Sequence, residues 1–278
     1  YPMNAVQPVS LDHVPDIRLI ACDMDGTLLD DEHAIHDDFW PLIEQLHERG
    51  IVFCPASGRQ YYNLLERFAP IAERLIFIAE NGSYVVRGGA EIGSECLARE
   101  AAHELIGVAR GLAAAGSNCG VVLCGKRSAY IERGDADFLA QVDRYYHRLA
   151  RVDDLLSVDD SLLKLAIYDF ESSERRIYPA LARFRATHQV VVSSAHWLDV
   201  MAPQANKGAG LRRIQQALGV AREQTMVFGD FLNDLEMMDE AAYSFAMANA
   251  HPLLKQRARF LAPGNGDNGV VRTIKSVL

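Results

Sequence analysis

Residues 17–27 read IRLIACDMDGT, a stretch that combines a strand signal with two carboxylates. The apolar run Ile17–Cys22 predicts a buried strand, and two aspartates, Asp23 and Asp25, follow it directly. Ligands of open α/β sheets collect at the carboxyl ends of the strands. Two carboxylates one residue apart can reach the same small volume there, and Gly26 lets the chain turn away. The same pattern in isolation is also typical of a simple turn, because Asp and Gly are both favoured in turns.

A second acidic cluster favours the functional interpretation. Residues 229–234 read GDFLND and follow the apolar run Met226–Phe228, which predicts another buried strand. Strands of one parallel sheet end at the same edge, so the carboxylates of this cluster are expected to converge with those of residues 23–25. Carboxylate oxygens are ligands that hard cations such as Mg²⁺ prefer. The two clusters together predict one acidic site.

Short apolar runs alternate with amphipathic stretches on both sides of a long interruption. This alternation predicts an α/β fold with a doubly wound, Rossmann-like parallel sheet. It breaks after Glu80-Asn81-Gly82, and the segment that follows has strand and helix candidates of its own. We therefore predict a core of residues 1–82 and 202–278, with an α+β cap of residues 83–201 inserted between its halves.

The charge and cysteine content exclude several partners. The chain has 37 acidic and 28 basic side chains, and its formal charge of −9 repels nucleic acid and anionic membrane surfaces. Any site for a phosphorylated molecule must therefore be built locally from a metal, a lysine and backbone N–H groups. The five cysteines form no C-x-x-C pair, and no run approaches the ~20 apolar residues of a membrane span. We expect a cytoplasmic protein that binds neither nucleic acid nor membranes; the oligomeric state stays open.

Four ordered motifs make the chain resemble the haloacid dehalogenase superfamily of phosphohydrolases, in particular its Cof-type branch, in which a large cap follows the third core strand. They are Asp23–Thr27, Ala56–Arg59, Lys207-Gly208 and Gly229–Asp234. The resemblance implies that Asp23 is a nucleophile that forms an aspartyl-phosphate. It implies that Asp25 is the general acid for the leaving oxygen and then the base that activates water.

The resemblance also implies a metal site. Mg²⁺ is expected to bind the Asp23 carboxylate, the Asp25 backbone carbonyl and Asp230. Asn233 and Asp234 are expected to position the metal ligands without binding the ion directly, with binding of Asp234 through a water molecule as the alternative.

The phosphate ligands follow from the second and third motifs. Ser57 and Gly58 are expected to offer a hydroxyl and backbone N–H groups to the phosphate. Lys207 opens a predicted helix, where a positive charge is unfavourable for the helix dipole, and this suggests that it binds phosphate instead. For Arg59 two interpretations remain: it assists the site, or it is a solvated helix residue.

Several residues depart from the family pattern or invite another interpretation. Phe231 stands where many relatives have a small residue, and Asp199 stands where Glu is frequent; neither is expected to change the chemistry. Trp40 and Trp197 are interpreted as packing residues rather than substrate platforms. The histidines have no zinc-ligand spacing, and we reject a zinc site formed by His33, His36 and His103.

The function predicted from these features is Mg²⁺-dependent hydrolysis of small phosphomonoesters, such as sugar phosphates. The cap is expected to select the substrate, with Asn81-Gly82 and Ala202-Pro203 as candidate hinges. One alternative is a phosphomutase or phosphotransferase, which shares the first half of the reaction. Another is a non-catalytic, phosphate-binding regulatory protein, and the intact Asp25 disfavours it because binding alone requires no acid or base.

Overall fold

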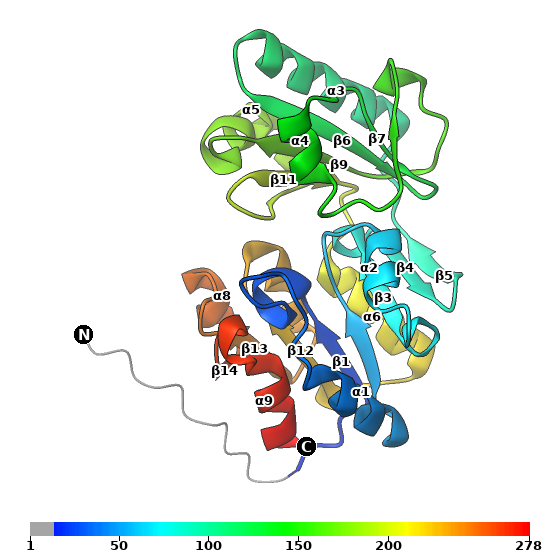
Figure 1. Cartoon of the computed structure of the whole chain (residues 1–278), viewed down its shortest axis with the longest axis vertical. Helices are drawn as coiled ribbons and strands as arrows, with labels where there is room; N and C mark the ends of the chain where they lie inside the picture. Colours follow the sequence, from blue (N-terminus) through cyan, green and yellow to red (C-terminus); the bar gives the residue numbers. More distant parts are fainter. Residues whose placement is uncertain (1–13) are drawn as a thin grey trace, which may run out of the picture.

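The computed structural model describes residues 14–278 as two bodies, one above the other in Figure 1. The lower body, the core, is built on a five-stranded parallel sheet with the strand order β14-β13-β12-β1-β2. The predicted α/β class with a parallel core sheet is thereby confirmed. The strands are β1 (Leu19–Cys22), β2 (Val52–Pro55), β12 (Thr225–Gly229), β13 (Tyr243–Met247) and β14 (Phe260–Ala262).

Helices cover both faces of the core sheet, as in other doubly wound folds. Figure 1 shows α1 and α9 in front of the sheet and α6 behind it. At the start of α6 the Asn206 side chain accepts a hydrogen bond from the Ala209 N–H, and the helix ends at Gly219 in the left-handed conformation. The core helices are α1 (Phe39–Glu48), α2 (Tyr61–Arg67), α6 (Lys207–Leu218), α7 (Leu235–Asp239), α8 (Pro252–Arg257) and α9 (Gly269–Val277).

A hairpin extends the core beyond β2. A parallel bridge between Ala56 and Ile78 joins β3 (Ile76–Ala79) to the sheet, and β3 pairs with β4 (Tyr84–Arg87), which pairs with β5 (Ala90–Ser94). Two β4 side chains, Val85 and Val86, are buried in the same hydrophobic cluster as the core strands. The sequence interpretation assigned this hairpin to the inserted segment, whereas its packing joins it to the core. The domain limits stay a prediction.

The upper body, the cap, has a separate six-stranded sheet with the order β10-β11-β9-β6-β7-β8. Neighbouring strands are antiparallel except for the parallel pair β7 and β8. The strands are β6 (Cys119–Gly125), β7 (Ala129–Ile131), β8 (Leu149–Arg151), β9 (Leu162–Asp169), β10 (Gln189–Val192) and β11 (Trp197–Met201). The cap helices are α3 (Arg99–Ala114), α4 (Ala136–Val142) and the short α5 (Tyr178–Ala180).

The two faces of the cap sheet carry different side chains. Side chains alternate along a strand, so Leu165 and Ile167 of β9 pack with α3 on one face. Lys164 of β9 lies on the other face. Asp199 of β11 shares that face, because β11 pairs with β9 in the register that sets Asp199 opposite Ala166. This second face of the cap turns toward the core.

Two further observations concern the described part of the chain. Its cysteines are all free, and four of them are buried while Cys96 is exposed. Among residues 14–278, no helix combines the length and the apolar character that crossing a membrane requires.

Candidate active site

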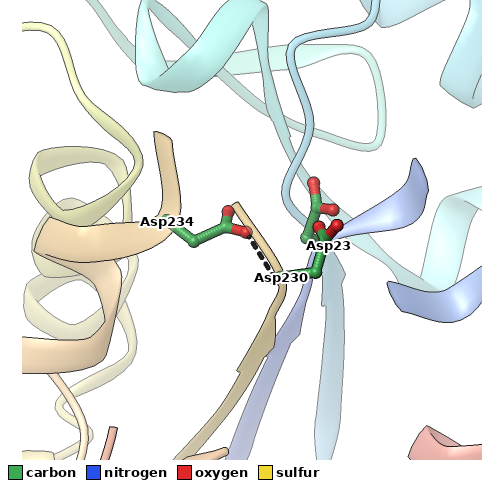
Figure 2. A group of neighbouring side chains, drawn as sticks. All are labelled: Asp23, Asp230 and Asp234. Carbon is green, nitrogen blue, oxygen red and sulfur yellow. Dashed lines mark hydrogen bonds between the residues drawn. The ribbon is translucent and has the colours of Figure 1, made fainter. Parts of the chain in front are cut away.

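Three aspartates meet at the carboxyl ends of the core strands. Asp23 follows β1, while Asp230 and Asp234 follow β12, and Figure 2 shows the three side chains around one volume. One carboxylate oxygen from each lies within 4.8 Å of those of the other two. A Cβ atom at Gly26 would lie 2.3 Å from Asp230 Oδ2, and Gly26 has a φ of +76°. Only glycine fits this turn, because both the space and the backbone conformation exclude a side chain.

Lys207 lies within this acidic group. Its side chain is fully buried at the start of α6, and Nζ donates to Asp23 Oδ1 at 2.5 Å and to Asp234 Oδ1 at 2.6 Å. The other oxygen of Asp234 accepts hydrogen bonds from the backbone N–H groups of Asp230, marked in Figure 2, and of Phe231. Asp234 is thus held by the lysine and the loop. The Lys207 side chain therefore contacts Asp23 and is not exposed to solvent.

The acidic group carries more negative charge than its surroundings neutralise. Burial, reinforced by the charge of Asp234, raises the pKa of Asp23 to about 7. Burial and the charge of Asp23 raise the pKa of Asp230 well above its ordinary value. If all three carboxylates were ionised, one ammonium would leave two negative charges, and the raised pKa values reflect this excess. This buried set of oxygen donors fits a divalent, hard cation such as Mg²⁺.

Asp25 points to a different set of partners. Arg59 donates to it twice, from Nε at 2.7 Å and from Nη2 at 2.6 Å, and His33 Nδ1 lies 3.3 Å from its Oδ1. Burial opposes the charge of Asp25, but the hydrogen bonds with His33 and Arg59 outweigh it and hold its pKa well below its ordinary value. Arg59 is only 2% exposed. Its interpretation as a solvated helix residue is therefore wrong.

The predicted phosphate ligands lie beside the aspartates, after β2. Ser57 is buried, its N–H donates to Ile78 O, and its hydroxyl oxygen accepts a hydrogen bond from the Arg59 N–H at 3.1 Å. A Cβ at Gly58 would approach Asn81 Oδ1 to 3.0 Å, so the loop passes close to the segment that follows β3. We call residues 57–59 the phosphate loop.

A cavity of about 230 Å³ lies between the core and the cap and opens onto these residues. On the cap side, Trp197 meets the Tyr145 ring edge to face at 5.7 Å, and the Tyr145 ring lies 4.7 Å from the Arg59 guanidinium. Trp197 packs in a cap cluster, as predicted, and it also lines the cavity. The core side contributes Asp23, Asp25, Gly26, Ser57, Gly58, Arg59, Asp230, Phe231 and Asn233, and the cap side Tyr145, Tyr146, Lys164, Ser193, Ser194, Ala195, Trp197 and Asp199.

Sequence reasoning left Arg59 undecided and missed three further residues of the site, His33, Tyr145 and Lys164. Arg59 had a usable signal, because a basic residue immediately after Ser57-Gly58 and just before a helix is in an unfavourable place for a solvated charge. His33 was considered only as a zinc ligand, and its contact with Asp25 depends on a loop conformation with a φ of +61°. Tyr145 and Lys164 come from the cap, and the sequence has no motif that identifies them.

Comparisons with known proteins agree on one protein family. The sequence profile of the haloacid dehalogenase-like hydrolases matches residues 20–274. The chain is 34% identical to the 5-amino-6-(5-phospho-D-ribitylamino)uracil phosphatase YbjI of Escherichia coli K12, over 94% of this chain and 96% of YbjI. It is 26% identical to YcsE of Bacillus subtilis, which has the same enzyme name, over 94% and 95% of the two chains.

Solved structures agree with the sequence comparison. The crystal structure of SMU.1108c from Streptococcus mutans UA159 superposes with a TM-score of 0.84 at 26% identity, covering 93% of this chain and 98% of the other. YbjI and YcsE are named phosphatases, and the resemblance inferred from the four motifs is confirmed. The chain belongs to the haloacid dehalogenase-like hydrolases.

Proposed function

We propose that this enzyme hydrolyses small phosphomonoesters with Mg²⁺ through a phosphoaspartate at Asp23. One observation carries the proposal: Asp23 lies at the floor of a cavity roofed by the cap, with Lys207 bonded to its carboxylate and Asp230 beside it. A lysine and a metal are what an acidic site requires before it can accept an anionic phosphate.

The first half of the reaction transfers the phosphoryl group to the protein. An oxygen of Asp23 forms the new bond to phosphorus as the bond between phosphorus and the ester oxygen breaks. Lys207 holds the Asp23 carboxylate in place and offsets charge on the transferring group. Asp25 gives its proton to the departing ester oxygen, which leaves as an alcohol.

The second half returns the enzyme to its starting state. Asp25, now ionised, takes a proton from a water molecule whose oxygen attacks phosphorus, and the bond to Asp23 breaks to release inorganic phosphate. In the arrangement described above, Arg59 and His33 favour the ionised form of Asp25. For Asp25 to donate a proton, at least one of these contacts must break when substrate binds. The substrate phosphate is an acceptor that competes for the Arg59 guanidinium.

Asp23, Asp230 and the Asp25 backbone carbonyl are the residues that would hold Mg²⁺, with Asn233 and Asp234 in support. When bound, the cation offsets repulsion between the carboxylate nucleophile and the phosphate. The charge of the buried group supports this assignment, because two negative charges would remain after Lys207 is counted if all three carboxylates were ionised.

The cavity lining and the relatives support a substrate class. Its lining combines aromatic rings with the hydroxyls of Ser193 and Ser194, which suits a polyol or sugar phosphate, including one that carries a flat ring. YbjI and YcsE are named for a ribityl phosphate attached to a uracil ring, so this compound belongs in the first substrate panel. A phosphotransferase remains the alternative. The cytoplasmic location and the cap limits of 83–201 stay predictions.

The test is to compare wild-type enzyme with Asp23→Asn on a panel of phosphorylated sugars, sugar alcohols and nucleotides, with Mg²⁺. We expect release of inorganic phosphate by the wild type and a kcat below about one hundredth of it in the variant, since an amide is not a nucleophile here. Asp239→Asn, which removes a carboxylate paired with Arg257 on the surface, is the matched control. Phosphate release by Asp23→Asn at the wild-type rate would refute the mechanism. Transfer to added alcohols instead of water would favour the phosphotransferase.

A further inference from the structure

The carbonyl groups of the phosphate loop all accept hydrogen bonds from outside the loop. The Ser57 carbonyl accepts from the Asn81 N–H at 2.9 Å, and the Arg59 carbonyl accepts from the Glu80 N–H at 3.1 Å. The carbonyl between them, at Gly58, accepts from Lys164 Nζ at 2.6 Å. Two of the three donors therefore belong to the core, and the third comes from the cap.

Lys164 reaches the core as a buried charge. It lies on β9 of the cap sheet, is 1% exposed, and has Nζ 2.8 Å from Glu80 Oε2 and 3.6 Å from Asp199 Oδ1. Within residues 14–278 the Glu80 carboxylate accepts no well-directed hydrogen bond, so the ion pair with Lys164 is its main compensation. Burial opposes the charge of Lys164, but Asp199 and Glu80 outweigh it and raise its pKa above its ordinary value.

Asp199 adds a second connection between the cap and the site. Its Oδ2 accepts a hydrogen bond from Asn81 Nδ2 at 2.5 Å, and Asn81 Oδ1 accepts from Asn233 Nδ2 at 3.0 Å. Asn233 and Asp230 both lie in residues 229–234, which we call the acidic loop. One cap face thus contacts the phosphate loop through Lys164 and the acidic loop through Asp199 and the segment after β3.

From this network we infer that Lys164 is a positioning residue, which orders the phosphate loop through the Gly58 carbonyl when the cap is closed over the core. The inference rests on the proposed function and adds a role for the cap besides selecting the leaving group. Because all three carbonyl oxygens are held by hydrogen bonds, the peptide groups of the loop cannot turn these oxygens toward the substrate phosphate. The negative charge of the phosphate requires N–H and O–H donors instead. Cap closure and phosphate binding then stabilise each other, because each orders the same loop.

A direct contact between Lys164 and the substrate is the competing explanation, since Lys164 also lines the cavity. The two explanations differ in which ligands they affect. A positioning role through Gly58 weakens every ligand that carries a phosphate, including inorganic phosphate, by a similar factor. A contact with the leaving group weakens only substrates large enough to fill the cap side of the cavity.

The experiment compares Lys164→Met with wild-type enzyme, measuring KM for a small and a bulky phosphate ester and the inhibition constant of inorganic phosphate. Loss of one charged hydrogen bond predicts that all three constants rise about 10- to 100-fold together. Lys126→Met is the matched control, because Lys126 is also paired with a glutamate, Glu91 of the β4–β5 hairpin, at 2.8 Å, and it does not line the cavity. This control is expected to leave the three constants unchanged.

Lys164→Met leaves Glu80 and Asp199 buried without their cation, and this can unfold the protein. The double variant Lys164→Met/Glu80→Gln removes one of these charges and carries the same test. Unchanged inhibition by inorganic phosphate in either folded variant, or an effect confined to the bulky ester, would overturn the inference. A wild-type enzyme that hydrolyses no ester would instead refute the proposed function, so the two failures are distinguishable.

Discussion

Removal of metal should make the stability of this protein fall as the pH rises. In the metal-free protein, burial and the charge of Asp234 raise the pKa of Asp23 to about 7, compared with an ordinary value of 3.8. Between these two pH values the folded state holds a proton that the unfolded state has lost. Stability due to this proton is present at low pH and disappears as the pH approaches 7.

The part of the effect that is due to Asp23 follows from the same two values, and Asp230, whose pKa is also raised, acts in the same direction. At 1.36 kcal/mol for each pH unit, the interval from 3.8 to about 7 corresponds to about 4 kcal/mol, of which about 3 kcal/mol falls between pH 5 and pH 8. For a chain of this length that is roughly 5 to 10 °C in melting temperature. Asp25 does not contribute in this window: its pKa lies below the ordinary value, so its stabilising effect is lost only below about pH 4.

Thermal melting in EDTA and in excess Mg²⁺, at several pH values from 5 to 8, measures this effect without an activity assay. We expect the difference between the two melting temperatures to grow with pH, because Mg²⁺ replaces the proton as the neutralising charge. Titration of groups far from the site changes both melting temperatures equally and therefore cancels in their difference. Asp230→Asn removes one of the three carboxylates and should reduce both the pH dependence and the effect of Mg²⁺. Equal pH profiles with and without Mg²⁺ in the wild-type protein would contradict the charge argument.

Two further predictions concern the chemistry and the cavity. If Asp25 protonates the leaving group, Asp25→Ala should reduce kcat for sugar phosphates about 100-fold or more but affect activated aryl phosphates less, because these need no proton; equal losses on both substrates would assign Asp25 to the metal or to the water step. Tyr145→Ala removes a cavity wall, and loss of one aromatic contact should raise KM about 2- to 10-fold for substrates with a ring while leaving small alkyl phosphates unchanged. A uniform change in KM for both substrate types would argue against ring recognition.

The parallel core and the acidic site could be predicted from sequence because their signals are local. A buried strand, the aspartates after it and the glycine that ends it all lie within residues 17–27, and parallel topology alone brings residues 229–234 to the same edge. The hairpin β4–β5 shows what local signals leave open. The sequence places its strands at the start of the inserted segment, but only packing decides that Val85 and Val86 bury against the core rather than the cap.

The cap residues of the site could not be predicted for a related reason. Lys164 lies in an apolar strand, LLKLAIYD, in which one lysine gives no indication of its partner. Its contact with Gly58 depends on which face of the cap sheet turns toward the core and on how far the cap is closed. The orientation of Arg59 depends on burial beneath the Tyr145 ring. These contacts form only where the cap packs against the core, and no periodicity in the sequence indicates how the two pack together.

The register of the core sheet also constrains how the protein is made. β1 lies between β2 and β12, and Leu19 pairs with both Val52 and Thr225. During synthesis, β1 and β2 leave the ribosome long before β12, and the complete cap sheet is synthesised in the interval. We therefore expect the cap to fold first, while one edge of β1 stays unpaired until residues 225–229 arrive. Because an unpaired edge strand can pair with other chains, truncation before β12 should give a protein that aggregates rather than a smaller folded core.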